Sequence, residues 1–278
     1  MKGFSVGNVE VIPISDGAFH MSRTFLTPEV HPATDERDDQ GRARLPILAF
    51  LVPGPPNVLI DAGLGPDPSA VLDALSQQVG VPRSGMGLQG DAGLVRRLHQ
   101  AGTKLDDINV VAISHLHADH VGWLLGKDGS PVFPHARVLL PAADIDYYLL
   151  GEQRSFPRAT RDALRELVAS GRFETCAPDE VISASITASP APGHTPGHTV
   201  FAISDRGERA MILGDAMYCP AQLTELDVGA MHDVDQTLAR RTREMIMRHA
   251  EAHATLNVGC HFAGGRAARI VEGHLQFD

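Results

Sequence analysis

The chain has 278 residues, of which 43% are hydrophobic, and its formal net charge is -10 at pH 7. This length and composition predict a folded protein with a large buried core and exclude a disordered chain. The negative charge disfavours nucleic acid and anionic lipid surfaces as partners, because the chain repels their phosphate groups. The first residues contain no apolar block suited to a signal peptide, and no stretch approaches the length of a membrane helix. We therefore expect a cytoplasmic protein without a membrane partner.

The N-terminal part is predicted to be mainly β-structure. Polar and apolar residues roughly alternate over 4–14, which predicts a strand. The apolar segments 47–52 and 58–61 are separated by the turn-forming sequence PGPPN and predict a hairpin. Between these lies 20–46, a long polar segment with proline, glycine and mixed charge. It predicts no core element; a lid or dimerisation loop is favoured over a plain solvated loop, and a homodimer is a possible assembly.

Helices and strands alternate in the rest of the chain. Periodicity predicts helices over 94–101, 144–150, 158–170 and 235–253, the last with Asp235 as its N-cap. It predicts strands over 108–113, 138–140, 182–188, 199–204, 210–213 and 255–258. Neither a linker nor a repeat of fixed period interrupts this order. The sequence therefore predicts one α/β domain over 1–278.

Strong metal ligands follow directly from the predicted strand 108–113, in the sequence SHLHADH. His115 and His117 are two residues apart, so on an extended backbone both rings project to one face and can reach a single ion. Asp119 and His120 follow as the chain turns away. They can serve a second ion about 3.5 to 4 Å from the first, as two-metal hydrolytic sites require.

Three further segments place polar side chains at the ends of predicted strands. His194 and His198 lie in the sequence PAPGHTPGHTV. Asp215 follows the predicted strand 210–213 in the sequence ILGDAMY, and His261 follows the predicted strand 255–258 in the sequence NVGCH. We expect these strand ends to meet along one edge of the sheets and to form one site. The other histidines considered are expected to be structural or exposed: His232, His249, His253 and His274.

The cysteines give a different prediction. Cys176, Cys219 and Cys260 are odd in number and widely spaced, which disfavours both a disulfide framework and a CxxC metal knuckle. We expect reduced, mostly buried thiols. Ligation of a metal by Cys260 or Cys219 is a minority interpretation, although Cys260 lies beside His261.

Taken together, HLHADH, PGHTPGH, the Gly-Asp after an apolar strand and the late isolated histidine resemble the metallo-β-lactamase fold superfamily over essentially the whole chain. The resemblance implies a four-layer αβ/βα sandwich. It implies that His115, His117 and His194 bind one metal, that Asp119, His120 and His261 bind another, and that Asp215 bridges the two. Asp61 in LIDAGLG matches the early aspartate that supports such a site from behind, and His198 is expected to hydrogen bond behind the ligands rather than bind metal.

Tyr218 lies three residues after Asp215, an arrangement similar to that of N-acyl homoserine lactonases. The resemblance implies two divalent metal ions, with Zn expected and Mn, Fe or Co as alternatives. The expected substrate is a small-molecule lactone or related carboxylic ester, whose carbonyl is attacked by metal-bound hydroxide. As catalytic residues we predict Tyr218, which would stabilise the oxyanion, and Asp119, which would pass a proton to the leaving alkoxide.

Other functions remain open at this point. The same scaffold also hydrolyses phosphotriesters, thioesters, sulfate esters and β-lactams, although class B1 β-lactamases typically have cysteine where this chain has Asp215. A persulfide dioxygenase-like oxidoreductase would use one iron held by two histidines and an aspartate. A binding protein without catalysis is disfavoured, because every expected ligand is present. The sequence contains no complete phosphate-binding loop.

Overall fold

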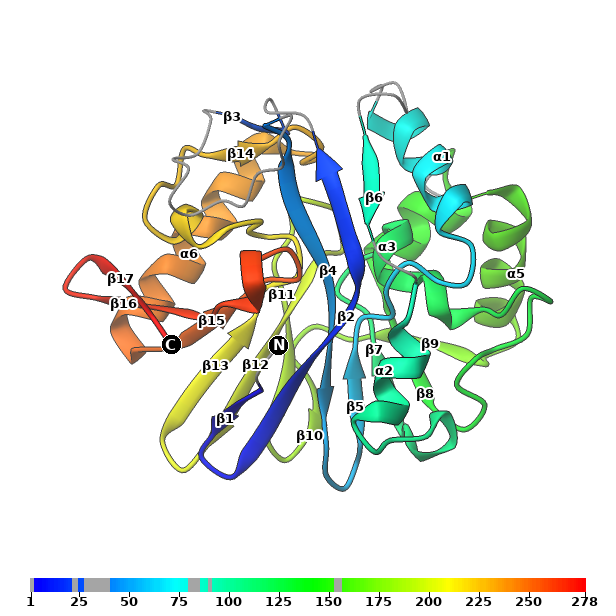
Figure 1. Cartoon of the computed structure of the whole chain (residues 1–278), viewed down its shortest axis with the longest axis horizontal. Coiled ribbons are helices and arrows are strands. Elements are labelled where there is room, and N and C mark those ends of the chain that lie inside the picture. Colours follow the sequence, from blue (N-terminus) through cyan, green and yellow to red (C-terminus); the bar gives the residue numbers. More distant parts are fainter. Residues whose placement is uncertain (1–2, 22–24, 28–40, 80–85, 90–91, 153–156) are drawn as a thin grey trace.

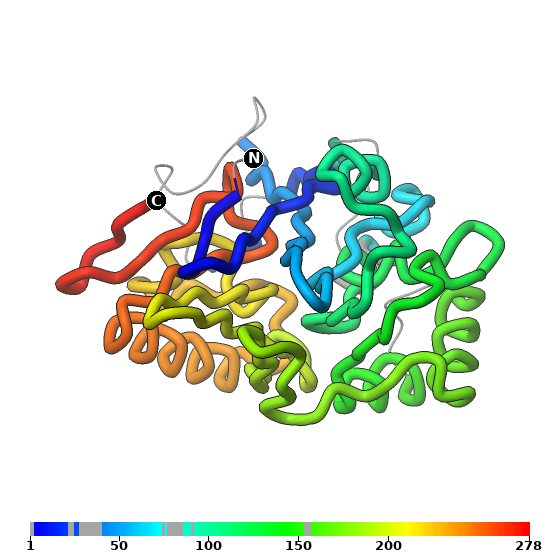
Figure 2. The backbone as a smooth tube through the Cα atoms, turned by 90° about the horizontal axis from the view of Figure 1, so that it is seen from below, coloured from blue at the N-terminus to red at the C-terminus, as the bar shows by residue number. Residues whose placement is uncertain are grey.

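A computed structural model of the protein describes residues 3–21, 25–27, 41–79, 86–89, 92–152 and 157–278. Two β-sheets face each other, and helices cover their outer sides (Figure 1). The view turned by 90° separates the halves of the chain, with the cyan to green segments on one side and the yellow to red segments on the other (Figure 2). Among the described residues, no helix combines the length and apolar character needed to cross a bilayer.

The first sheet has the strand order β1-β2-β4-β5-β7-β8-β9, and β6 pairs with β2. Its middle is a mixed sheet, since β4 runs antiparallel to β5 whereas β5, β7, β8 and β9 are mutually parallel. The strand bounds are β1 (Phe4–Val6), β2 (Val9–Met21), β4 (Ala43–Val52), β5 (Val58–Ile60), β6 (Gly87–Gln89), β7 (Val110–Ala112), β8 (Arg137–Pro141) and β9 (Phe173–Cys176).

The second sheet has the order β10-β11-β12-β13-β15-β16-β17, and a short separate ribbon pairs β3 with β14. The strand bounds are β3 (Leu26–Thr27), β10 (Glu180–Ser183), β11 (Ile186–Pro190), β12 (Thr199–Asp205), β13 (Glu208–Ile212), β14 (Gly229–Ala230), β15 (Leu256–Val258), β16 (Ala268–Val271) and β17 (His274–Phe277). The helices are α1 (Pro68–Val79), α2 (Leu94–Gln100), α3 (Ala118–Val121), α4 (Ala142–Asp144), α5 (Arg158–Ala169) and α6 (Gln236–His253), and a π-helical turn (Ile145–Leu150) continues α4.

Three clusters of buried apolar side chains hold the layers together. The central one lies between the sheets and includes Phe50 and Phe201. A second packs α2 and α5 on the first sheet, and a third packs α6 on the second sheet. Burial of these surfaces is the main favourable term in folding. The predicted four-layer αβ/βα sandwich is confirmed.

Several predicted elements are confirmed closely. The segments 47–52 and 58–61 pair as the β4–β5 hairpin, with Val52 opposite Val58. Asp235 caps α6, because its carboxylate accepts a hydrogen bond from the Leu238 backbone N–H. The cysteines are all free and buried, as expected.

Three predictions need correction. Residues 4–14 are not one strand but the hairpin β1–β2, which turns at Gly7 with φ of +59°. Likewise 182–188 is divided between β10 and β11. In 20–46, the expectation of no core element is wrong at the edges, because β2 reaches Met21, β4 begins at Ala43, and Phe25 is buried. The rest of the predicted lid or dimerisation loop, 22–24 and 28–40, lies outside the described residues.

Candidate metal centre

Ends of strands from both sheets deliver the predicted ligands to one place. His115 and His117 follow β7, and α3 then carries Asp119 and His120. His194 lies in the turn between β11 and β12, and both Asp215 and His261 follow strands of the second sheet. All of these side chains are buried. The sequence-predicted set therefore meets in space, although its members come from distant parts of the chain.

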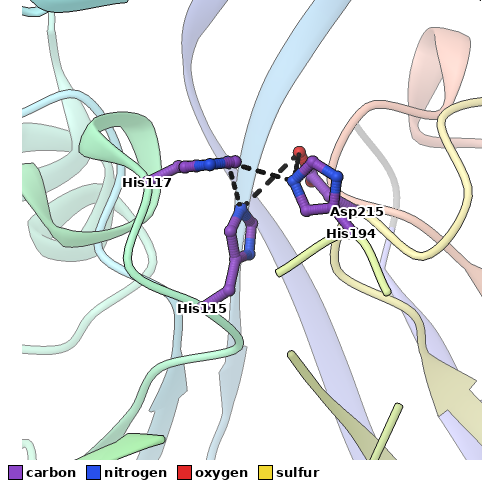
Figure 3. A group of neighbouring side chains, drawn as sticks. All are labelled: His115, His117, His194 and Asp215. Carbon is purple, nitrogen blue, oxygen red and sulfur yellow. Dashed lines mark hydrogen bonds and ion pairs between the residues drawn. The ribbon is translucent and has the colours of Figure 1, made fainter. Parts of the chain in front are cut away.

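One group of ligand atoms comprises His115, His117, His194 and one oxygen of Asp215 (Figure 3). The Nδ1 atom of His117 lies 2.9 Å from Nε2 of His115 and 3.0 Å from Nε2 of His194. The Oδ2 atom of Asp215 lies 3.8 Å from the His115 nitrogen and 3.7 Å from the His194 nitrogen. Imidazole and carboxylate donors converging in this way suit a divalent transition metal.

A second group forms around the other oxygen of Asp215. Its Oδ1 atom lies 3.2 Å from Nε2 of His120 and 3.2 Å from Nε2 of His261. The Oδ2 atom of Asp119 lies 3.5 Å from each of these same nitrogens. The two oxygens of Asp215 thus face different ligand groups, which is the position a bridging carboxylate needs.

Each inward-facing histidine has a hydrogen-bonding partner on its other ring nitrogen. Such partners fix the orientation of the ring and direct the remaining nitrogen lone pair toward a metal. The pairs are His115 Nδ1 with Ser114 Oγ at 3.0 Å, His117 Nε2 with Tyr148 Oη at 2.9 Å, His120 Nδ1 with Asp61 Oδ2 at 2.9 Å, His194 Nδ1 with Asp233 Oδ1 at 3.0 Å, and His261 Nδ1 with the Pro46 carbonyl at 2.6 Å.

Two buried atoms at the centre test whether these residues fit a metal. Within the described part of the chain, Nε2 of His120 and Oδ1 of Asp215 have no hydrogen-bond partner of suitable geometry, although they lie 3.2 Å apart. Buried polar atoms are nearly always paired, so such atoms call for a ligand. Both are of the type that coordinates divalent metals. The cluster fits divalent metal ions.

Charge within the cluster is unevenly distributed. Burial, followed by neighbouring histidines such as His120, lowers the pKa of His115 well below its usual range. For His120, burial acts in the opposite direction, but Asp215 and then Asp119 raise its pKa well above the usual range. Neutral imidazole is the metal-binding form, so His115 is ready to bind a metal at pH 7.

The predicted supporting residues lie behind the ligands. Asp61 accepts hydrogen bonds from the Ser114 backbone N–H at 2.8 Å and the Ser114 hydroxyl at 2.9 Å. The Cys260 thiol also donates to Asp61, at 3.2 Å, which places its sulfur in this supporting layer. His198 accepts from the Asp215 backbone N–H at 3.0 Å, the kind of contact predicted for it. Gly214 is needed there, since it has φ of +53° and a Cβ would come within 2.7 Å of His198.

A narrow pocket opens above the metal ligands. Its lining includes Tyr218, whose ring stacks on His261 with centroids 5.0 Å apart. Phe19, Met21, Phe25 and Leu45 form its apolar wall, and His232 adds a polar group. His232, expected to be structural or exposed, thus lines the pocket.

Sequence reasoning missed other contributors as well. Tyr148 falls within the predicted helix 144–150, and nothing in its local pattern indicates contact with His117. Asp233 lies 39 residues after His194, and its carboxylate also pairs with Arg243 at 3.2 Å. The only sequence signal available was the proximity of Asp233 to His232 in an otherwise turn-like segment.

Comparisons with known proteins agree with this geometry. A family model described as "Metallo-beta-lactamase superfamily" matches residues 42–249. A probable metallo-hydrolase of Mycobacterium tuberculosis is 29% identical over 177 residues, which is 58% of this chain and 53% of that protein. The N-acyl homoserine lactonase AiiB of Agrobacterium fabrum is 26% identical over 172 residues, which is 61% of this chain and 58% of that protein. The chain thus matches little more than half the length of these curated relatives.

Among solved structures, the likeness extends over the whole fold. The structure of AidC, a dizinc quorum-quenching lactonase in complex with a product, has a TM-score of 0.77 to this chain. It covers 100% of this chain and 96% of its own, at 19% sequence identity. At this identity the likeness shows a shared fold.

Proposed function

The chain belongs to the metallo-β-lactamase superfamily, and from this premise we propose that it is a dinuclear metal-dependent hydrolase of lactones or related carboxylic esters. The observation that carries the proposal is the position of Asp215. Its two carboxylate oxygens face two separate groups of ligands, each with at least two histidine nitrogens. A site for one ion would not need the second group.

We propose zinc in both positions, with Mn, Fe or Co as alternatives, because imidazole and carboxylate donors accept all of these. His115, His117 and His194 would hold one ion, and Asp119, His120 and His261 the other. Bound ions of this kind supply a hydroxide nucleophile at neutral pH and polarise the bond under attack. Asp215 would keep the two positions at a fixed separation.

Tyr218 would donate a hydrogen bond to the substrate's carbonyl oxygen as negative charge develops there. Burial, followed by the charge of Asp215, raises the pKa of its hydroxyl well above the usual range, so the hydroxyl keeps its proton at pH 7. A neutral donor in a buried site is worth more than one in water, because little solvent screens it. Lactonases among the structural neighbours support this choice of substrate class.

Asp119 would carry the proton. Burial raises the pKa of Asp119, but His120 and then His261 lower it by more than burial raises it. Asp119 is therefore a carboxylate anion. The carboxylate would accept the proton that the attacking water loses and deliver it to the alkoxide when the ester C–O bond breaks. The product of a lactone is then a hydroxy acid, with all atoms of the water incorporated.

Tyr218→Phe is expected to lower kcat/KM for lactones by about a hundredfold to a thousandfold, the range found for loss of one oxyanion donor. The ring packing on His261 and Phe25 is retained, so metal content and thermal stability should be unchanged. Steady-state kinetics on a lactone that the parent protein hydrolyses measures the effect. Unchanged turnover on every active lactone would remove Tyr218 from the mechanism.

The proposal as a whole is tested by metal analysis and a substrate panel on one preparation. We expect about two zinc-like ions per chain and hydrolysis of lactones, with activity lost on chelation and restored by added zinc. The panel should include aryl esters, phosphotriesters, thioesters, sulfate esters and a β-lactam. One iron per chain with oxygen uptake and no hydrolysis would instead favour a dioxygenase.

A further inference from the structure

His232 is a polar group in the pocket that neither set of ligands employs. It lines the same narrow opening as His117, Asp119 and Tyr218. Its ring packs edge-on against Phe25, with centroids 4.5 Å apart, and lies 6.2 Å from the ring of Tyr218. Its Nδ1 atom is buried and has no hydrogen-bond partner among the described residues.

The segment that carries His232 is held firmly in place. The following residue, Asp233, bonds to Nδ1 of His194 at 3.0 Å and to Arg243 at 3.2 Å. The Val234 backbone N–H then donates to the His194 carbonyl at 3.0 Å. His232 therefore has a fixed position relative to the metal ligand His194, and its ring centroid lies 6.5 Å from that ring.

An unpaired buried polar atom is unfavourable for folding, and a substrate group that pairs with it would relieve this cost. A neutral imidazole offers one N–H donor and one lone pair, so it can pair with either kind of polar group. The same lining includes the apolar side chains of Phe19, Met21, Phe25 and Leu45.

We propose that His232 determines substrate specificity by hydrogen bonding to a hydroxyl or amide substituent close to the reacting carbonyl. The apolar wall of the pocket contacts the hydrocarbon part of the same substrate. This inference rests on the proposed lactone or ester hydrolysis. It narrows the substrate class to esters and lactones that are polar on one side of the carbonyl and apolar on the other. His232 acts in binding and does not take part in the bond changes.

The test uses matched pairs of small lactones on the metal-loaded protein. One pair is α-hydroxy- and α-methyl-γ-butyrolactone, and the other is β-hydroxy- and β-methyl-γ-butyrolactone. Within each pair a hydroxyl is replaced by a methyl group of nearly the same size. We expect the parent protein to prefer the hydroxylated member of at least one pair by about tenfold or more in kcat/KM. The methyl member would leave the buried polar group of the site without a hydrogen bond. His232→Phe should abolish this preference while it keeps the packing against Phe25.

Further variants separate a binding role from a structural one. His232→Asn places an amide near the original Nδ1 position and should restore part of the preference, whereas the exposed control His274→Phe should leave it intact. The measured quantity is a ratio within each pair, so a general loss of folded or metal-loaded protein does not move it. Equal turnover of both members, or a preference that survives in His232→Phe, would overturn the role of His232. Absence of any lactone or ester turnover, or of metal, in the parent protein would overturn the proposed function itself.

Discussion

Replacing Asp215 by asparagine is expected to lower turnover by about a thousandfold or more, because both proposed metal positions depend on this one side chain. Its Oδ2 faces His115 and His194, and its Oδ1 faces His120 and His261, at 3.2 to 3.8 Å. Asparagine keeps the shape but removes the negative charge and one acceptor oxygen. A loss of about 4 kcal/mol in stabilisation of the transition state corresponds to this thousandfold effect.

Metal content should fall together with turnover. We expect elemental analysis of Asp215→Asn to find fewer ions per chain than in the parent protein, and activity to recover only in part at high zinc concentration. The matched control is Asp106→Asn, in which the replaced aspartate is exposed and distant from the site. A variant that retains both full metal occupancy and full activity would show that Asp215 does not bridge the ions.

The ligands of this centre were predictable because their spacing is local. His115 and His117 are two residues apart on an extended segment, and Asp119 and His120 begin the helix that follows. Each remaining ligand follows an apolar strand, and strands are readily recognised by their pattern. The local pattern and the positions of the strand ends were sufficient to predict that these residues lie together along one edge of the sheets.

The partners on the outer sides of the histidines were not predictable in this way. Tyr148 reaches His117 from a π-helical turn, which changes the direction of side chains relative to an ordinary helix. Asp233 reaches His194 from a segment without a clear pattern. These contacts depend on how distant elements pack, and single-sequence periodicity does not contain that information. The same reason applies to His232.

The segment 20–46 shows a different limit. Its average composition is polar, yet Met21, Phe25 and Leu26 are buried and Ala43 begins a long strand. Isolated apolar residues separated by polar ones carry a weak signal, and here their partners are distant in sequence, as Met21 lies opposite Ala43. Leu26, for example, lies opposite Ala230 in the β3–β14 ribbon.

A second large effect is expected on stability, at Asp144. This buried carboxylate joins the two loops that carry metal ligands. It accepts hydrogen bonds from the Leu116 backbone N–H at 2.9 Å, the Gly197 backbone N–H at 2.6 Å and the Thr195 hydroxyl at 2.8 Å. Burial raises the pKa of Asp144, which shows that burying this carboxylate has a cost; the three donors offset that cost.

Asp144→Ala would remove the acceptor of the buried Leu116 N–H and of the partly buried Gly197 N–H, and we expect the free energy of unfolding to fall by about 2 to 4 kcal/mol. Chemical denaturation in the presence of a chelator measures this without a contribution from metal binding. The matched control is Asp128→Ala, which also removes an aspartate bonded to a backbone N–H and a hydroxyl, both of Ser130, but at an exposed site. Its effect should stay within about 0.5 kcal/mol. If the two variants lose the same free energy of unfolding, Asp144 does not hold the ligand loops together. A much larger loss in Asp144→Ala would show that the loop carrying His115 and His117 is fixed to the loop carrying His194 before any metal binds.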